Sequence, residues 1–253
     1  MNTYDLSGRV AIITGATGGI GTALATEFYK QGASLALTGR DPDALLRLSD
    51  KLTEDESSDA PAPLCICADL TAIDAPRTIV QRAAEHFGRL DILVNNAAII
   101  EGQMFLKTSE SFLNKMTHTN YTVPYQLSQN ALPYMLKQKF GRLIYITSVA
   151  GCMGDAGMSA YAGSKAAVAG MAKSVATEYG RRNITANCIA PGIVDTQAIK
   201  KLPPERQKAL KEMIPARRFA QPEEIAYLAV FLASERAAYI NGQQIHINGG
   251  LVR

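Results

Sequence analysis

The chain has 253 residues, of which 47% are hydrophobic and 19% are charged, and its formal net charge at pH 7 is +3. This composition is typical of a globular protein and argues against extended disorder. Because the net charge is small and no dense run of lysine and arginine occurs, we expect no nucleic-acid partner. No apolar run approaches the roughly 18 residues of a membrane helix, so we expect no membrane partner either.

The first residues, Met1 to Asp5, lack the basic and apolar regions of a secretory signal peptide. The sequence has four cysteines, and no histidine pattern completes a metal site with them, so we expect no metal. We expect reduced, buried cysteines that only pack, with Cys65 and Cys67 pointing to opposite faces of one strand. A redox or metal role is the weaker alternative. With reduced cysteines, the expected compartment is the cytoplasm.

Short apolar runs alternate with amphipathic helical stretches along the chain, which is the pattern of a parallel sheet covered by helices on both faces. A helix over 19–31 follows the first strand, and the next helix begins with Asp41 as N-cap and Pro42 at its first position. The polar segment 53–61 is interpreted as a surface loop, so a single domain over 1–253 is expected. The predicted strands are 9–14, 34–38, 64–68, 91–95, 142–147, 184–189 and 244–247.

The segment 195–221 interrupts this alternation near the end of the chain. It is rich in lysine, arginine, proline and glutamine, and it lies between a predicted strand and a helix predicted from Pro222 to Ala233. In an α/β fold, such an excursion at the carboxyl end of a strand lies where substrates bind. We therefore predict that this segment covers the substrate.

A glycine-rich segment, Thr14-Gly15-Ala16-Thr17-Gly18-Gly19-Ile20-Gly21, joins the first strand to the first helix. Glycines at this turn let the backbone approach a pyrophosphate, and the start of the helix offers unpaired N–H groups to it. Such turns also occur for packing alone. Their position between a strand and a helix favours a dinucleotide site here.

The end of the second strand indicates which dinucleotide is bound. A site for NAD would offer an acidic side chain to the adenosine ribose, whereas this sequence has Gly39-Arg40. The guanidinium of Arg40 can bind a ribose phosphate, which favours NADP(H); the alternative is a solvated arginine beside Asp41 and Asp43. Asp69, after the third strand, is expected either to accept a hydrogen bond from the adenine amine or to serve as the N-cap of the next helix.

Tyr161 and Lys165 are four residues apart in a predicted helix and therefore lie on one face of it. The ammonium, together with the positive nicotinamide of an oxidised cofactor, is expected to lower the pKa of Tyr161 toward the working range of a proton donor. On its own such a pair is common and usually structural. Ser148, thirteen residues earlier at the end of a buried strand, can orient the substrate oxygen and favours the catalytic interpretation.

The three histidines, His86, His118 and His246, pair with no plausible nucleophile in the sequence. Since Tyr161 already supplies an acid, we expect surface or packing roles for all three.

Together these motifs resemble those of the short-chain dehydrogenase/reductase family, along essentially the whole chain. The resemblance is specific because six elements share the order and spacing of the family. They are Thr14-Gly15-x-x-x-Gly19-x-Gly21, Asn95-Asn96-Ala97-Ala98, Asn120, Ser148, Tyr161-x-x-x-Lys165 and Pro191-Gly192-Ile193-Val194-Asp195-Thr196. The resemblance implies a Rossmann-type α/β fold with a doubly wound, seven-stranded parallel sheet, and a catalytic set of Asn120, Ser148, Tyr161 and Lys165.

The resemblance also implies roles for individual residues. Lys165 would hold the nicotinamide ribose, Asn120 would anchor a water that links Lys165 to solvent, and Asn95 would steady the central strand. Ala98 stands where the family more often has glycine, and its methyl group is expected to adjust packing near the adenosine without excluding the cofactor. The residues expected to bind NADP(H) are Gly15, Thr17, Gly19, Ile20, Gly21, Arg40, Asp69, Leu70, Asn95, Ala97, Tyr161, Lys165, Pro191, Gly192, Val194 and Thr196, with Ile193, Val194 and Thr196 at the nicotinamide carboxamide.

Within the family, the sequence is most similar to bacterial 3-oxoacyl-[acyl-carrier-protein] reductases. The similarity lies in segments 140–144 and 151–157 and in the tail, although the tail elements recur in sugar, steroid and polyol relatives. Lys139 and Arg182 fall where such a reductase carries basic residues that dock the acidic carrier protein; two ordinary solvated cations are an equally weighted alternative. Relatives of this kind form homotetramers, which we also expect here.

The expected function is hydride transfer from NADPH to a ketone, with a 3-oxoacyl thioester on acyl carrier protein as the leading substrate. A dehydrogenase or reductase of another small carbonyl or alcohol, such as a sugar, polyol, steroid or quinone, is the alternative. A non-catalytic NADP-binding regulator is less favoured, because a sensor needs no Tyr–Lys–Ser arrangement. The physiological substrate depends on loops rather than on the scaffold, and the motifs do not determine it.

Overall fold

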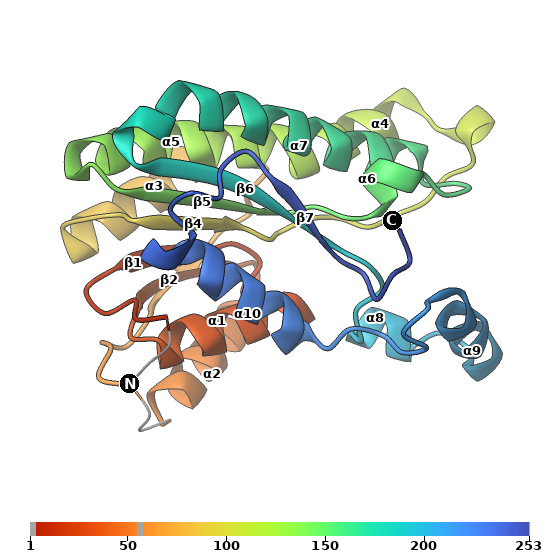
Figure 1. Ribbon diagram of the computed structural model, residues 1–253, viewed down its shortest axis with the longest axis horizontal. Helices are drawn as coiled ribbons and strands as arrows, with labels where there is room; N and C mark the ends of the chain where they lie inside the picture. The colour runs from red at the N-terminus through yellow and green to blue at the C-terminus, as the bar shows by residue number, and fades with distance from the viewer. Residues whose placement is uncertain (1–3, 55–57, 253) are drawn as a thin grey trace.

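A computed structural model describes residues 4–54 and 58–252, and Figure 1 shows their arrangement. The first residues and the centre of the loop predicted at 53–61 lie outside this described part. All strands pair in parallel in the order β3-β2-β1-β4-β5-β6-β7, so the predicted doubly wound, seven-stranded sheet is confirmed. The strands are β1 (Val10–Ile13), β2 (Ser34–Gly39), β3 (Leu64–Cys67), β4 (Ile92–Asn95), β5 (Gly141–Ile146), β6 (Ile184–Pro191) and β7 (Gln244–Ile247).

The helices follow the expected alternation, and their ends carry the predicted signals. The Asp41 carboxylate accepts a hydrogen bond from Ala44 N at 3.0 Å, which confirms it as an N-cap. A π-helical turn, η2 (His118–Thr122), joins the fourth and fifth helices. The helices are α1 (Gly19–Lys30), α2 (Pro42–Thr53), α3 (Ala75–Phe87), α4 (Glu110–Thr117), α5 (Val123–Gln138), α6 (Ala150–Met153), α7 (Ser159–Tyr179), α8 (Gln197–Lys200), α9 (Pro204–Met213) and α10 (Pro222–Ala233).

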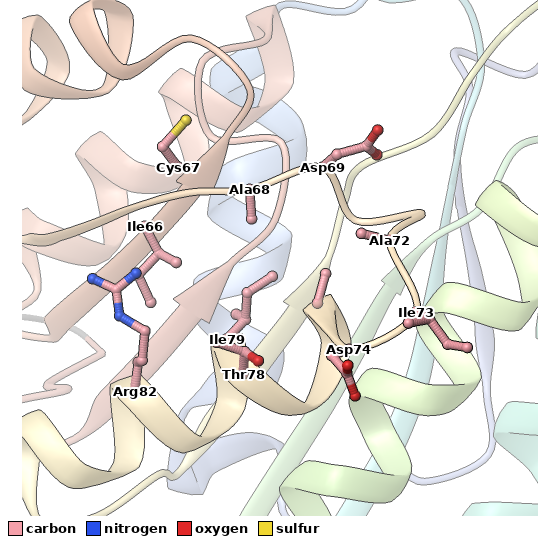
Figure 2. A pocket seen from close by; sticks show the side chains of 11 residues that line it. Ile66, Cys67, Ala68, Asp69, Ala72, Ile73, Asp74, Thr78, Ile79 and Arg82 are labelled. Carbon is pink, nitrogen blue, oxygen red and sulfur yellow. The ribbon is translucent and has the colours of Figure 1, made fainter.

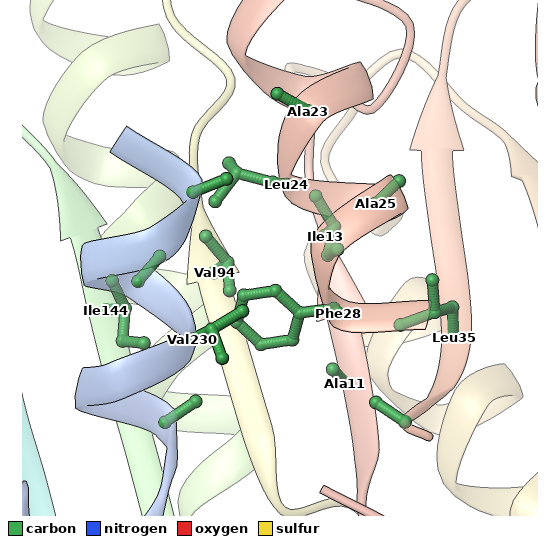
Figure 3. Close-up of a cluster of buried hydrophobic side chains, with 14 of the residues drawn as sticks. Ala11, Ile13, Ala23, Leu24, Ala25, Phe28, Leu35, Val94, Ile144 and Val230 are labelled. Carbon is green, nitrogen blue, oxygen red and sulfur yellow. The ribbon is translucent and has the colours of Figure 1, made fainter. Parts of the chain in front are cut away.

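The sheet lies between two layers of helices, each with its own apolar cluster. On one face α1, α2 and α10 bury side chains that include Phe28 and Val230, which lie together in Figure 3. On the other face α3, α5 and α7 bury side chains that include Ile79, Leu127 and Val168. Each such fully buried side chain stabilises the fold by about 1.5–3 kcal/mol. The strand order reverses between β1 and β4, and a doubly wound sheet binds ligands at the carboxyl ends of its strands at that point.

The cysteines differ from the expectation in two respects. Cys65 and Cys67 are two residues apart in β3, and side chains two apart in a strand share a face, so the prediction of opposite faces was wrong. Their sulfur atoms lie 3.4 Å from Leu45 O and 3.5 Å from Arg40 O, both on the side of α2. Cys188 is buried, which raises its pKa to about 12, but Cys67 and Cys152 are exposed. All four are unpaired, and the described residues contain no cluster of three potential metal ligands.

The segment 195–221 folds into two short helices, α8 and α9, between β6 and α10. Figure 1 shows both helices away from the two layers that cover the sheet. Neither helix contains a buried residue. Among the described residues, no helix is long and apolar enough to cross a membrane.

Candidate active site

The glycine-rich turn between β1 and α1 has the tight geometry that the motif predicts. Gly15 has φ +62°, and a Cβ on Gly21 would collide with the carbonyl oxygen of Gly15. The N-cap of α1, Gly18, has no side-chain hydrogen bond, so no side chain of its own caps the N–H groups at this helix start. This combination provides a backbone site for a phosphate group.

Thr14 and Asn96 brace this turn, although the motifs predicted no separate role for either residue. The Thr14 hydroxyl accepts hydrogen bonds from the backbone N–H groups of Asn96 (2.9 Å) and Ala97 (3.0 Å). The Asn96 amide in turn donates to Thr14 O at 2.9 Å and to Gly15 O at 3.2 Å. The role of steadying the central strands, expected of Asn95, therefore falls to Asn96. The Asn95-Asn96 pair is apparent in the sequence. Successive side chains of a strand point to opposite faces, however, and this direction decides which of the two asparagines reaches the neighbouring strand.

Asn95 itself is buried at the carboxyl end of β4, and neither polar atom of its amide has a hydrogen-bond partner among the described residues. The Thr38 hydroxyl, at the end of β2, is likewise buried without a partner in the described structure. Buried polar groups are costly when unpaired, so such atoms at the carboxyl ends of parallel strands, where this kind of sheet binds ligands, indicate a polar ligand. The glycine cradle and these side chains fit a dinucleotide.

Arg40 and Asp69 lie together at the ends of β2 and β3. Arg40 is exposed there. The Asp69 carboxylate accepts from Thr71 N (2.9 Å) and Thr71 Oγ1 (2.7 Å); these bonds, and to a lesser degree the charge of Arg40, hold its pKa below the ordinary value. The helix that follows begins after Asp74, so the expectation of Asp69 as its N-cap was wrong.

A pocket of about 340 Å³ lies between β3 and the start of α3, with Asp69 at its rim (Figure 2). Its wall includes Ile66, Ile79 and Arg82. Figure 2 shows the Asp69 carboxylate directed away from Ile66 and Ile79. This pocket contains neither Ser148 nor Tyr161, so it is separate from the candidate catalytic centre.

Tyr161, Ser148 and Lys165 meet beside the carboxyl end of β5. Tyr161 is 6% exposed; burial raises its pKa, and a hydrogen bond with the Ser148 side chain acts in the opposite direction. The Lys165 ammonium donates to Ile146 O at 2.8 Å and lies 5.8 Å from the centre of the Tyr161 ring. Burial lowers the pKa of Lys165 to about 8.

These shifts differ from the expectation for the tyrosine. Lys165 and the oxidised nicotinamide were together expected to lower the pKa of Tyr161, but burial dominates and raises it. The Lys165 ammonium donates to a backbone carbonyl and lies 5.8 Å from the centre of the Tyr161 ring, so burial of the hydroxyl is the larger influence. A positive nicotinamide beside Tyr161, the other part of the expectation, would act in the same direction as the ammonium.

Asn120 lies in the π-helical turn, and π-turns frequently occur at functional sites. Its amide exchanges two hydrogen bonds with the backbone of Ile99, at 2.9 and 3.0 Å, and donates to Ser164 Oγ at 3.2 Å. Ser164 donates in turn to Tyr161 O at 2.7 Å. Asn120 therefore ties the segment after β4 to the helix that bears Tyr161 and Lys165.

The end of β6 and the segment after it lie beside Ser148 and the glycine turn. Val149 N donates to Pro191 O at 3.1 Å, which joins the last residue of β6 to the residue after Ser148. A Cβ on Gly19 would lie 3.0 Å from Thr196 Cγ2, so Thr196 covers the start of α1. Ala97 lies directly against Gly15, and Leu70 packs beside the second apolar cluster. The predicted cofactor residues thus lie at or beside the carboxyl ends of strands β1 to β6, from the edge strand β3 to the centre of the sheet.

Lys139 and Arg182 are exposed neighbours, since Asn183 Nδ2 donates to Lys139 O at 3.2 Å. They lie at the amino ends of β5 and β6, whereas Ser148 follows the carboxyl end of β5. Six residues of strand span about 20 Å. Within one chain the two cations therefore cannot flank the entrance beside Ser148; only a neighbouring subunit could bring them there.

His246 also differs from the expectation that no histidine contacts a nucleophile. Its Nε2 lies 3.8 Å from the sulfur of Cys152, and Gln244 Nε2 donates to the same sulfur at 2.9 Å. The three residues come from α6 and β7, which are far apart in the sequence, so no local pattern indicated the contact.

Comparisons with known proteins agree with this geometry. Residues 15–252 match a family model described as enoyl-(acyl carrier protein) reductase. Nodulation protein G from Rhizobium sp. (strain N33) is 38% identical over 248 residues, with 98% of each chain covered. The 3-oxoacyl-[acyl-carrier-protein] reductase FabG of Vibrio harveyi is 35% identical over 247 residues, also with 98% of each chain covered. A solved structure from Sinorhizobium meliloti 1021, provisionally assigned as a short-chain alcohol dehydrogenase, has a TM-score of 0.91 and 32% identity and covers 98% of this chain and 97% of its own.

Proposed function

Because this chain belongs to the short-chain dehydrogenase/reductase family, we propose that it reduces a ketone to a secondary alcohol with NADPH, and that the ketone is a 3-oxoacyl thioester on acyl carrier protein. The observation that supports the proposal is the meeting of three side chains: the half-buried Ser148 interacts with the buried Tyr161, and the Lys165 ammonium lies 5.8 Å from the centre of the Tyr161 ring. A protein that only bound a nucleotide would need the glycine turn but not this pairing. Named relatives that act on carrier-bound substrates support the choice of substrate.

In the proposed mechanism, the hydroxyls of Ser148 and Tyr161 donate hydrogen bonds to the carbonyl oxygen. NADPH, when bound, supplies the hydride that reaches the carbonyl carbon. Tyr161 then donates its proton to the oxygen, and the cationic Lys165 stabilises the tyrosinate that remains. Asn120, which holds Ser164 and through it the backbone of Tyr161, keeps the helix in place.

The preference for NADP(H) over NAD(H) is proposed from the end of β2. The residue directly after β2 is the exposed Arg40, where a site for NAD would have an acidic side chain. Asp69, close enough to interact with the charge of Arg40, is proposed to meet the adenine. The buried amide of Asn95 is proposed to bind the cofactor, because nothing in the described protein satisfies it.

Docking of the carrier protein is proposed to use Lys139 and Arg182 of a neighbouring subunit. This requires an oligomer, and we propose the homotetramer expected from the sequence. Tyr227 and Tyr239, which are 55% and 103% exposed, lie on α10 and just before β7, and large exposed apolar side chains are typical of such interfaces. We further propose that 1–253 is one domain in which α8 and α9 cover the substrate. The unpaired cysteines fit the cytoplasm as its compartment.

A small-molecule ketone or alcohol remains the second candidate, favoured by the similarity to a structure assigned as an alcohol dehydrogenase. The test is NADPH oxidation against a panel of acetoacetyl thioesters, sugars, quinones and ketosteroids, with NADH as a parallel cofactor. The proposal expects the highest kcat/KM with the thioesters and with NADPH. Higher kcat/KM with a sugar, quinone or steroid would replace the substrate, and no turnover of any carbonyl would favour a nucleotide-binding regulator.

A further inference from the structure

We propose that the turn formed by Asn248, Gly249 and Gly250, which we call the Asn-Gly-Gly turn, is a positioning element for the proposed substrate-covering segment 195–221. The turn follows β7 at the carboxyl end of the sheet, the same end at which Ser148 follows β5. Figure 1 shows the chain reversing direction after β7 at the end of the sheet nearest α8. None of the three residues takes part in the proposed hydride transfer.

The turn contacts the chain just before the covering segment begins. Gly192 N donates to the carbonyl oxygen of Ile247, the residue before the turn, at 3.0 Å. A Cβ on Gly192 would lie 2.9 Å from Asn248 Cα, so the two backbones are in direct contact. The turn therefore fixes the point at which the chain leaves β6.

The turn also contacts the chain just after α9. Gly249 has φ +61°, and its carbonyl oxygen accepts a hydrogen bond from Ala216 N at 3.0 Å. A Cβ on Gly249 would lie 2.8 Å from Ile214 Cγ2, too close for any residue except glycine unless something shifts. Because Ile214 is only 2% exposed and is packed on all sides, the part that shifts is the covering segment.

A second closure joins the two ends of the covering segment to each other. Ala220 N donates to Ile193 O at 2.9 Å, and Asp195 N donates to Ala220 O at 2.8 Å. These bonds and the Asn-Gly-Gly turn together close the neck of a loop that carries α8 and α9. Because neither helix contains a buried residue, their position depends mainly on this neck.

The Asn248 side chain gives the turn its shape. Its Oδ1 accepts a hydrogen bond from Gly250 N at 2.8 Å, and its Nδ2 donates to Val252 O at 3.0 Å. Asn248 is buried, so truncation of its side chain would leave the Gly250 N–H without its partner in a site with little access for water. Truncation should therefore displace the turn and the covering segment together.

Resting on the proposed function, we expect the turn to set how closely α8 and α9 fit a bound substrate. A displaced turn should weaken substrate binding but leave the chemistry intact, because Tyr161 and Lys165 are held by α7. In kinetic terms, KM should rise while kcat stays nearly constant.

The first experiment follows the covering segment without any substrate, by limited proteolysis with trypsin and mass spectrometry. Lys200, Arg206 and Lys208 are exposed on α8 and α9 and provide the cleavage sites, and the exposed Arg47 on α2 is the internal reference. Gly249→Ala should raise the rate of cleavage at these sites, relative to Arg47, by at least about fivefold, the scale set by a left-handed alanine.

Gly88→Ala is the matched control for this experiment. Gly88 also has a left-handed φ of +73°, but a Cβ there would meet nothing within 4 Å. The control therefore introduces the same backbone strain without pushing on the covering segment, and the cleavage ratio should stay that of the wild type. An equal rise in both variants, or no rise in Gly249→Ala, would overturn the proposal.

The second experiment changes the turn without adding an atom. Asn248→Ala should raise both the cleavage ratio and KM for an acetoacetyl thioester by about fivefold, the scale of one lost hydrogen bond, with kcat and the dissociation constant of NADPH nearly unchanged. Asn248→Asp keeps the acceptor for Gly250 N and should recover most of the protection and of the substrate affinity.

If Asn248→Asp behaves like Asn248→Ala, or if kcat falls while KM stays constant, the turn does not act by positioning the covering segment. Proteolysis is read without substrate or turnover. Failure of the proposed carbonyl reaction would therefore not be mistaken for failure of this element.

Discussion

The proposed cofactor side and substrate side of the site differ in how deeply their residues are buried. On the cofactor side, the turn after β1 is held by Gly21, where an added Cβ would collide with backbone, and by hydrogen bonds between Thr14 and the half-buried Asn96. On the proposed substrate side, α6, α8 and α9 contain no buried residue. Substitutions in a site built into the buried sheet disturb the core, whereas exposed short helices can change at little cost to the core.

The names of the relatives differ although the fold is shared. The relatives cover almost the whole chain, yet their names include a nodulation protein, a 3-oxoacyl reductase and an alcohol dehydrogenase. If the proposed function is correct, the buried frame binds the nucleotide, and exposed segments select the ketone.

The largest expected effect is at Tyr161, where the rate of catalysis and the affinity for NADPH should respond differently. Tyr161→Phe removes the proposed proton donor, so kcat should fall by at least about 10²-fold, the scale of general acid catalysis. NADPH affinity, measured by fluorescence, should stay nearly constant because the cofactor side is held by other residues. Substantial turnover in the folded variant would show that another group donates the proton.

A smaller effect is expected on the cofactor side alone. Arg40→Ala should weaken NADPH by roughly 1.5–3 kcal/mol through loss of a charged hydrogen bond, and should leave NADH nearly unaffected. Dissociation constants for both cofactors provide the test, with Arg47→Ala, at an exposed arginine on α2, as the matched control. Equal weakening of both cofactors would contradict the proposed phosphate contact.

On the substrate side, charge reversal tests docking. Lys139→Glu combined with Arg182→Glu should lower kcat/KM for a carrier-bound substrate by about tenfold at low salt, mainly through association, and the loss should shrink as salt rises. Reduction of a small thioester that needs no docking should barely change. If both substrates respond alike, the two cations form only a solvated surface.

The smallest effect concerns stability. The folded pKa of Lys165 is about 8 against an ordinary value of 10.5, so between these values the unfolded chain binds more protons and stability rises with pH. Lys165 alone should add about 1 kcal/mol to the free energy of unfolding between pH 8 and 9. Raised thiol pKa values, as at Cys188, act in the opposite direction, so the measured quantity is the difference in slope between the wild type and Lys165→Met. Parallel slopes in urea unfolding would show that Lys165 is not held in a desolvated state.

The sequence by itself determined the order of strands and helices, because apolar periodicity and capping residues act locally. Asp41 as an N-cap and the helix from Pro222 are examples, and each expected strand is present within two residues of its bounds. The tight glycine turn also followed from residue type, since only glycine tolerates φ near +60° without strain.

The tertiary structure alone decided which side chains are in contact and which of them are buried away from solvent. It gave the bracing role to Asn96, placed Lys139 and Arg182 at the edge opposite Ser148, and brought His246 to Cys152. It also made burial the dominant influence on the pKa of Tyr161. Contacts between distant segments and the loss of solvent depend on how the layers pack, and no local pattern of residues contains that information.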